Sequence, residues 1–281
     1  ANGQIYRGVL TGFNKAFVID TAKRDELIAK DPKSAEIIKR LAVGDDVRKW
    51  HIRESDRWLI FTRRGIDINQ YPAIKAHLAQ WKDDLTPKNS TEKIGRKPGS
   101  YQWYEIQDNV AYFPKFDQPK IVYPDIAKES RFAFDETGKY INDTAFEIII
   151  DDLYLLGILN SSIIWKYLCN KVAVLGDAEK AGRLRLKRIY IEKVPIPNAQ
   201  PQEKSAIETL VNYIIYLTVQ LKDIPSHGQK MVETAEDKLM LSYFEQIVDA
   251  LVMELYLSEE LHNHDKYFMR HLLSENLPAI E

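Results

Sequence analysis

The sequence has a single cysteine, Cys169, and no apolar run long enough to cross a membrane. The longest mainly apolar stretch, Phe146–Leu159, is interrupted by Glu147, Asp151 and Asp152, whereas a membrane span needs about 20 apolar residues. No signal peptide pattern opens the chain. A lone cysteine cannot form an internal disulfide, so we expect a protein of the reducing cytoplasm. Because Cys169 lies in an apolar helical pattern, we expect a buried, unreactive thiol.

Motifs for catalysis are missing as well. An adenine methyltransferase that uses S-adenosylmethionine needs a glycine-rich loop and an Asn-Pro-Pro-aromatic motif, and the sequence has neither. A paired-carboxylate nuclease needs acidic groups and a lysine around a metal ion, but Pro124-Asp125 is far from the Glu-x-Lys at Glu236–Lys238. His262 and His264 do not share a helix face, and no cysteine pair lies nearby to complete a zinc site. We therefore expect no catalytic residue and no metal site in this chain.

Net charge is small but unevenly distributed. The chain carries 39 lysines and arginines against 41 aspartates and glutamates, a net charge of −2. Residues 1–198 hold 33 basic and 27 acidic residues (+6), and residues 199–281 hold 6 and 14 (−8). This asymmetry predicts that the front part faces a polyanion and the rear part does not. The alternative is a modest excess of charge that only solvates the surface.

Hydrophobic periodicity predicts short strands and helices in the first part of the chain. Strand-like runs are Ala16–Asp20, Trp58–Thr62, Tyr101–Ile106, Lys120–Tyr123, Phe132–Phe134 and Phe146–Ile150. Helical patterns cover Asp25–Leu41, Pro72–Lys82 and Asp152–Val172. The first of these is one helix or two, with Pro32 starting the second. The polar stretch Thr86–Ser100 predicts a loop, and Asp135–Gly138 predicts a hairpin turn.

The pattern changes near residue 198. Apolar residues then repeat at helical spacing from Leu210 to Leu221 and again from Phe244 to Leu255, and Asp223–Lys230 is the predicted linker between two long helices. We therefore predict the α+β fold class. A mixed, β-rich domain over residues 1–198 is followed by an acidic helical domain over residues 199–281 with a C-terminal pair of long helices.

Basic residues gather beside glycine and aromatic residues near the ends of predicted strands. The segment Arg7–Lys15, with Thr11, Asn14 and two glycines, suits phosphate contacts through backbone N–H groups, and a simple turn explains it equally well. Arg48 precedes Lys49-Trp50, and Arg63-Arg64 precedes a glycine. Such clusters are typical of nucleic-acid surfaces and also of solvated loops.

One segment alternates strictly between basic and apolar residues. In a strand, Leu184 and Leu186 would face a core, while Arg183, Arg185 and Lys187 would face outward about 6.8 Å apart. That spacing suits the phosphates of one DNA strand. An edge strand guarded by charge against aggregation has the same pattern.

These segments, in this order, resemble the TaqI-like C-terminal specificity domain of single-chain restriction–modification enzymes and adenine-specific DNA methyltransferases. The matching pieces are Tyr6–Ile19, Ile38–Trp50, Trp58–Phe61, Tyr71–Ile74, Trp103–Ile106, Pro119–Ile126, Leu156–Ser161, Gly182–Leu186 and Val194–Pro197. No single piece is specific, but their order over residues 5–197 is. The chain begins with Ala1 rather than Met, and we expect a fragment whose catalytic domain lies upstream.

The resemblance implies a target-recognition domain that binds double-stranded DNA across the major groove. It positions the target adenine for an upstream methyltransferase domain. The candidate DNA contacts are Arg7, Thr11, Asn14, Lys15, Arg48, Arg63, Arg64, Lys120, Arg131, Arg183, Arg185 and Lys187. Arginine can read guanine and asparagine can read adenine, but we expect most of these residues to hold phosphates.

The resemblance also implies that this chain itself holds no cofactor. The parent enzyme would bind S-adenosylmethionine, and Mg²⁺ if it also cleaves DNA as a type IIG restriction enzyme in phage defence. The alternative interpretation is a helical protein-interaction module. Residues 199–281 would then hold a subunit of a phage-defence complex, without base-specific readout of their own.

Overall fold

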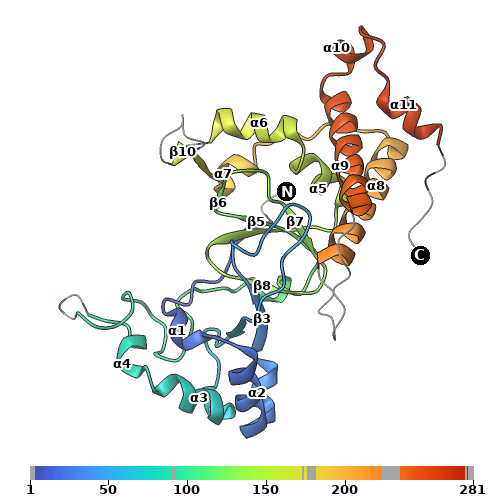
Figure 1. Ribbon diagram of the computed structural model, residues 1–281. Coiled ribbons are helices and arrows are strands. Elements are labelled where there is room, and N and C mark those ends of the chain that lie inside the picture. The colour runs from blue at the N-terminus through green and yellow to red at the C-terminus, as the bar shows by residue number, and fades with distance from the viewer. Residues whose placement is uncertain are drawn as a thin grey trace.

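The computed structural model describes residues 4–89, 91, 93–172, 174–175, 182–222, 235–275 and 277. Short strands and helices occupy the chain as far as Ile191, and long helices follow (Figure 1). This arrangement confirms the predicted α+β class with its C-terminal helices. Among the described residues, no helix is both long and apolar enough to cross a bilayer. The predicted linker Asp223–Lys230 lies outside them.

The central sheet is antiparallel and joins strands that lie far apart in the sequence. Its order is β1-β9-β5-β7, with β1 at Ile5–Arg7, β9 at Ala145–Ile149, β5 at Lys120–Pro124 and β7 at Ala133–Asp135. All of β5 is buried, because its side chains alternate between two packed faces. Ile121 and Tyr123 enter the largest core, whereas Val122 enters a smaller cluster.

A second sheet, in the order β2-β4-β3-β8, lies in the lower part of Figure 1. Its strands are β2 (Val18–Ile19), β4 (Trp58–Ile60), β3 (Ile38–Ala42) and β8 (Tyr140–Ile141). The α-helices of this part are α1 (Asn14–Phe17), α2 (Thr21–Lys30), α3 (Pro72–Ala79) and α4 (Lys82–Leu85). Its 3-10 helices are η1 (Pro32–Glu36), η2 (Ile68–Gln70) and η3 (Phe113–Lys115). Phe17, Leu59 and Ile74 belong to its separate core.

A third, three-stranded sheet carries the alternating basic segment. Its strands are β10 (Val174–Leu175), β11 (Arg183–Arg185) and β6 (Ile126–Ala127), in the order β10-β11-β6, and α7 (Arg188–Ile191) follows. Leu184 and Leu186 are buried while Arg183, Arg185 and Lys187 are exposed, which confirms the predicted alternation. The strand ends at Arg185, so Lys187 does not continue the predicted row.

The C-terminal helices pack onto the rest of the chain through α5 (Leu153–Leu159). They are α8 (Pro201–Lys222), α9 (Ala235–Tyr256), α10 (Ser258–His262) and α11 (Phe268–Leu273). Gly157 permits the contact, since a Cβ there would lie 3.1 Å from side-chain atoms of Ile207 and Val211. The predicted boundary near residue 198 therefore falls between segments that share one hydrophobic core.

Three segments differ from their predicted form. The predicted helical segment Asp25–Leu41 is divided: α2 ends at Lys30, and η1 starts at Pro32, where a second helix was predicted. Its last part instead forms β3, where β-branched Ile38 pairs with β4. The predicted strand Ala16–Asp20 starts only at Val18, after α1. The predicted strand Tyr101–Ile106 consists of turns.

The predicted helix Asp152–Val172 is broken into α5 and α6 (Ser162–Lys171). At the break, the Asn160 side chain accepts a hydrogen bond from the Phe132 N–H at 3.1 Å and donates one to the Phe132 carbonyl at 2.8 Å. Ser161 caps the N-terminus of α6. These bonds tie the helix pair to the segment that leads into the central sheet.

Two smaller predictions also need correction. Cys169 is exposed on α6, although its neighbour Leu168 is buried as the pattern indicated. The turn Asp135–Gly138 links β7 to β8, and because these strands belong to different sheets they form no hairpin.

A buried guanidinium organises the long segment between α4 and β5. Arg96 is 3% exposed. It donates hydrogen bonds of 2.7 to 3.3 Å to the backbone carbonyls of Leu85, Thr11, Glu105, Gln102 and Trp103. Burial lowers the pKa of Arg96 to about 10, so it remains charged at neutral pH. The carbonyls near residue 103 bond to Arg96 instead of a neighbouring strand, which explains why no strand forms there.

The central sheet also buries ionisable side chains. Lys120 is fully buried and lies 2.9 Å from the Asp135 carboxylate across the strand pair. Glu147 on β9 is 1% exposed, and neither of its oxygens has a hydrogen-bond partner among the described residues. Burial raises the pKa of Glu147 from 4.5 to about 8. Glu147 is therefore mostly protonated at neutral pH.

Replacing Arg96 with methionine keeps much of the side-chain volume but leaves several buried carbonyls without a donor. We expect Arg96→Met to lower the free energy of unfolding by at least about 3 kcal/mol. Urea denaturation followed by tryptophan fluorescence measures this. The control is Lys97→Met, next to it and exposed, which should change stability by less than about 0.5 kcal/mol. Equal stability of the two variants would contradict the organising role of Arg96.

Glu147 predicts a pH dependence of stability with a definite sign. Its pKa is raised on folding. The contribution of Glu147 to the stability of the folded state is therefore fully present below about pH 4.5 and is lost as pH rises through about 8. Glu147→Gln cannot ionise. Urea denaturation measures the free energy of unfolding of both proteins. Between about pH 5 and 8, that of the variant should rise relative to that of the unsubstituted chain by up to about 1.4 kcal/mol per pH unit. Exposed Glu136→Gln is the control, and a pH-independent difference for Glu147→Gln would refute the prediction.

Candidate nucleic-acid interface

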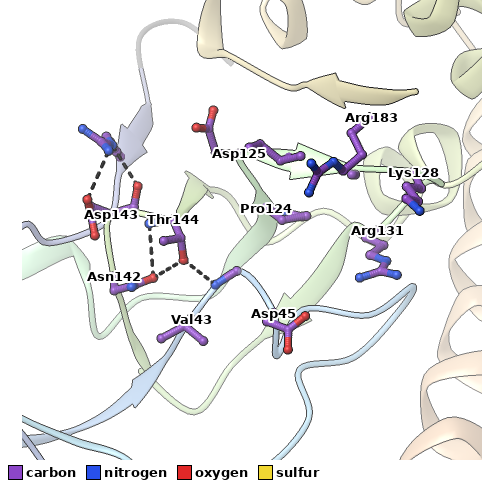
Figure 2. A pocket seen from close by; sticks show the side chains of 14 residues that line it. Val43, Asp45, Pro124, Asp125, Lys128, Arg131, Asn142, Asp143, Thr144 and Arg183 are labelled. Carbon is purple, nitrogen blue, oxygen red and sulfur yellow. Dashed lines mark hydrogen bonds and ion pairs between the residues drawn. The ribbon is translucent and has the colours of Figure 1, made fainter. Parts of the chain in front are cut away.

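A cleft of about 640 Å³ opens where the central sheet meets the three-stranded sheet and two loops (Figure 2). Its lining comes from Arg7 at the end of β1, the loop 43–45, residues within 124–131, the turn 142–144 and Arg183 of β11. The fold thus brings together three of the predicted DNA contacts, Arg7, Arg131 and Arg183, from distant parts of the sequence.

Cationic side chains lie along one side of this cleft. Lys128, Arg131 and Arg183 are close to one another in Figure 2, beside β6 and β11. Arg131 forms an ion pair with Glu129 at 2.9 Å. Within the described part of the chain, the side chains of Lys128 and Arg183 have neither an ion pair nor a hydrogen bond. No carboxylate of the described residues therefore competes with an anionic ligand for these two cations.

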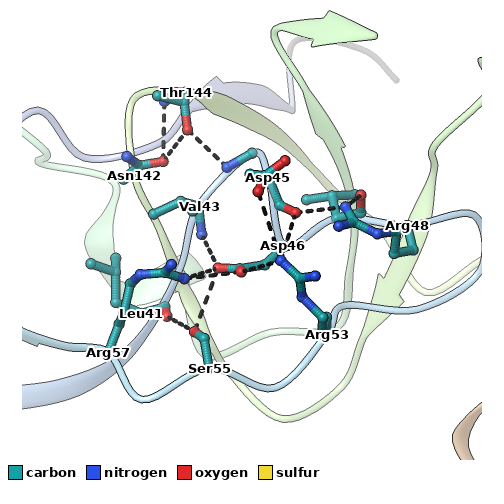
Figure 3. Close-up of polar contacts among 12 residues, drawn as sticks. Leu41, Val43, Asp45, Asp46, Arg48, Arg53, Ser55, Arg57, Asn142 and Thr144 are labelled. Atoms are coloured by element: carbon teal, nitrogen blue, oxygen red, sulfur yellow. Dashed lines mark hydrogen bonds and ion pairs between the residues drawn. The ribbon is translucent and has the colours of Figure 1, made fainter. Parts of the chain in front are cut away.

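The opposite side is a loop fixed from beneath by a buried carboxylate (Figure 3). Asp46 is 1% exposed, and its two oxygens lie 2.9 and 2.8 Å from Nη1 of Arg57. One of them also accepts the Val43 N–H at 3.0 Å. The Gly44 N–H donates to Oγ1 of Thr144 at 2.8 Å, and a Cβ on Gly44 would lie 2.5 Å from the Thr144 carbonyl oxygen. The loop and the turn 142–144 therefore hold each other at a distance that only glycine permits.

The first strand closes one end of the cleft. Arg7 pairs with the Asp143 carboxylate at 3.2 Å and donates from Nε to the Asp143 carbonyl at 2.9 Å. A Cβ on Gly8 would lie 2.1 Å from the Asn142 carbonyl oxygen, so this close approach of two backbones requires glycine. The Arg7-Gly8 motif therefore fixes the turn 142–144 and contributes a cation to the cleft.

Two of the predicted DNA contacts are wrong because the side chains are buried. Lys120 is 0% exposed and neutralises Asp135 inside the central sheet. Thr11 is 3% exposed, and its hydroxyl donates to Asn14 Oδ1 at 2.7 Å and accepts the Phe13 N–H at 3.2 Å. Thr11 stabilises the turn before α1.

Other predicted residues are accessible but lie outside the cleft lining. Asn14 and Lys15 are exposed on α1. Arg63 lies over the Phe113 ring at 5.2 Å, and Arg64 donates to the Gln107 carbonyl at 2.9 Å. These residues stay predictions as DNA contacts.

Two further predicted residues contact the lining of the cleft. Arg48 donates to the Asp45 carbonyl at 2.6 Å and so supports the loop, and Arg185 pairs with Asp125 at 3.3 Å. Lys187 is exposed just before α7. All three stay predictions as DNA contacts.

The sequence analysis missed several residues of the lining. Lys128 stands alone between a matched segment and a Glu-Ser pair, so no local pattern marks it. Asp45, Asn142 and Thr144 lie in short polar segments, and their side chains are of types that are common in ordinary turns. The glycines at 8 and 44 were the available signal, since each marks a close approach of two segments.

Two methyltransferases are similar to this chain in sequence. The chain is 25% identical over 230 residues to the type II methyltransferase M.BanIII of Aneurinibacillus aneurinilyticus, covering 74% of the chain and 37% of that protein. It is 25% identical over 198 residues to the type II methyltransferase M.PaeR7I of Pseudomonas aeruginosa, covering 68% and 31%. The chain therefore spans about a third of the length of these relatives.

The same fold occurs in a solved structure. The type IIL restriction–modification enzyme MmeI, solved in complex with DNA, matches 97% of this chain and 36% of its own with a TM-score of 0.61 and 14% identity. The family described as the TaqI-like C-terminal specificity domain matches residues 39–196, more than half of the chain. That match includes every lining residue of the cleft except Arg7. The chain therefore belongs to the TaqI-like C-terminal specificity domain family.

Proposed function

We propose that this chain binds double-stranded DNA and supplies the sequence specificity of an adenine-methylating restriction–modification enzyme. The observation that carries the proposal is the cleft, in which Lys128, Arg131 and Arg183 line one side. Two of these cations have no partner among the described residues. Phosphates are the anions that such cations attract, because neutralising them releases counterions. MmeI, which has the same fold, was solved in complex with DNA.

The shape of the cleft supports base readout as well as phosphate binding. Its other side presents carboxylate, amide and hydroxyl groups of Asp45, Asn142 and Thr144 on short, fixed segments. Phosphate contacts set the register of a protein on the duplex, while polar groups at base edges carry the sequence information. A cleft with cations on one side and hydrogen-bonding groups on the other can perform both tasks.

Methyl transfer belongs, in this proposal, to an upstream methyltransferase domain. The relatives are methyltransferases about three times as long as the matched region. The cleft lining has neither a glycine-rich loop nor an Asn-Pro-Pro-aromatic motif, so its residues do not fit S-adenosylmethionine. The cofactor, and Mg²⁺ if the enzyme also cleaves DNA as a type IIG restriction enzyme, would be bound elsewhere in the parent enzyme. Phage defence and a cytoplasmic location complete the proposal.

Arg183→Ala tests the phosphate-binding side of the cleft. Fluorescence anisotropy with labelled duplexes, over about 50 to 300 mM salt, should show weaker binding to all sequences and a salt slope reduced by about 1. Arg270→Ala removes an exposed arginine from α11 and should change neither quantity. If the unsubstituted chain does not bind duplex DNA at low salt, the proposed function is wrong.

The adenine assignment has its own test in the parent enzyme. Single-molecule sequencing of DNA from cells that carry the intact enzyme should reveal N6-methyladenine at one defined sequence. The 281-residue chain alone, incubated with S-adenosylmethionine and DNA, should transfer no methyl group. A modified cytosine at the recognised sequence would contradict the adenine assignment, and turnover by the chain alone would reveal a catalytic site within it.

A further inference from the structure

Most of the cations that line the cleft lie together on one side, whereas Arg7 lies beside the turn 142–144. Lys128, Arg131 and Arg183 lie on one side in Figure 2, while Asp45 lies on the loop below and Asn142 on the turn to the left. If these three cations contact phosphates, the loop that carries Asp45 faces the space between the two phosphate backbones of the duplex. That space holds the base edges of a DNA groove.

Three aspartates line the cleft, and their carboxylates differ in their ion-pair partners and in their exposure. Asp143 pairs with Arg7 at 3.2 Å and is 23% exposed, and Asp125 pairs with Arg185 at 3.3 Å and is 15% exposed. Asp45 forms a longer ion pair, with Arg53 at 3.7 Å, and its side chain is 82% exposed. Of the three carboxylates, that of Asp45 is thus the most accessible to a ligand.

The backbone beneath this exposed side chain is rigidly supported. The Asp45 carbonyl accepts from Arg48 at 2.6 Å, and the residues on both sides of Asp45 are held by Thr144 and by the buried Asp46–Arg57 pair (Figure 3). A recognition group held by such a supporting shell loses little conformational freedom on binding. The position of Asp45 is therefore preorganised, although its carboxylate is exposed.

An exposed carboxylate in a phosphate-binding cleft needs a reason, since it repels the DNA backbone. Repulsion becomes useful when it discriminates between bases. A carboxylate has only acceptors, so it favours a base that presents a donor and opposes bases that present lone pairs.

We propose that Asp45 reads one base pair in the major groove by accepting a hydrogen bond from the exocyclic amino group of cytosine. This inference rests on the proposed function. Cytosine presents a donor there, whereas guanine and thymine present acceptors that a carboxylate repels. Adenine presents its amino donor beside the N7 acceptor, and a carboxylate has no proton to donate to N7. Asp45 therefore selects a C·G pair at one position of the recognised sequence.

The experiment selects bound duplexes from a randomised library with the full 281-residue chain. Among the base positions that the unsubstituted chain specifies, one should be enriched in cytosine. Asp45→Ala should lose that preference alone and bind the cognate duplex about 5- to 100-fold more weakly. Its affinity for non-cognate duplexes should stay equal or increase, because a negative charge is gone. A loss of folding would not reproduce this opposite pair of changes.

A second variant and a matched control keep the test decisive. Asp45→Asn is nearly isosteric and should shift the preference at that position towards adenine, since a carboxamide satisfies both groups of its edge. Asp265→Asn changes another exposed aspartate, beyond α10, and should leave the preference intact.

The possible results separate the two proposals. If the unsubstituted chain binds no DNA or selects no sequence, the proposed function fails. If it selects a sequence and the Asp45 variants keep the same preference, or weaken all duplexes equally, the role of Asp45 is wrong while DNA recognition stands.

Discussion

The buried Asp46 carboxylate is the constraint on which the shape of the cleft depends. A carboxylate with 1% exposure is costly unless it is paired, and here Arg57 and the Val43 N–H supply the donors. Those bonds fix the turn that carries Gly44 and Asp45 into the cleft. Without them the loop would be a flexible surface connection.

Two separate hydrophobic cores fill the molecule. The larger one joins the central sheet to the C-terminal helices, and the second fills the part of the molecule built on β2, β3 and β4. Between them lies a small cluster that includes Ala42, Ala133 and Ala145, whose short side chains let the two sheets approach closely. The cleft lies above this junction, so its walls come from both parts and their separation is set by packing rather than by loop flexibility.

Local sequence patterns predicted the features of the fold that depend only on residues close together in the sequence. The two long helices and the alternation around Leu184 and Leu186 follow from side-chain periodicity, which a sequence displays directly. Lys120 escaped such reasoning because its partner, Asp135, is set by strand register, and an isolated lysine in a sequence indicates a surface. The break before α6 depends on an Asn160 bond to distant Phe132. Likewise, the set of lining residues exists only after β1, β5 and β11 have been brought together.

Trp50 connects this interface to the helical end of the chain. It adopts a φ of 76°, rare for an aromatic residue, and its indole N–H donates to Glu245 of α9, which Lys49 also approaches at 3.2 Å. Two polar contacts therefore join Lys49 and Trp50 to α9, although almost two hundred positions separate these residues from Glu245 in sequence. An exchange of segments between related chains would have to carry both ends together to keep these contacts. A crossover near residue 198 would pair Trp50 of one parent with α9 of the other and leave the indole N–H facing a foreign partner.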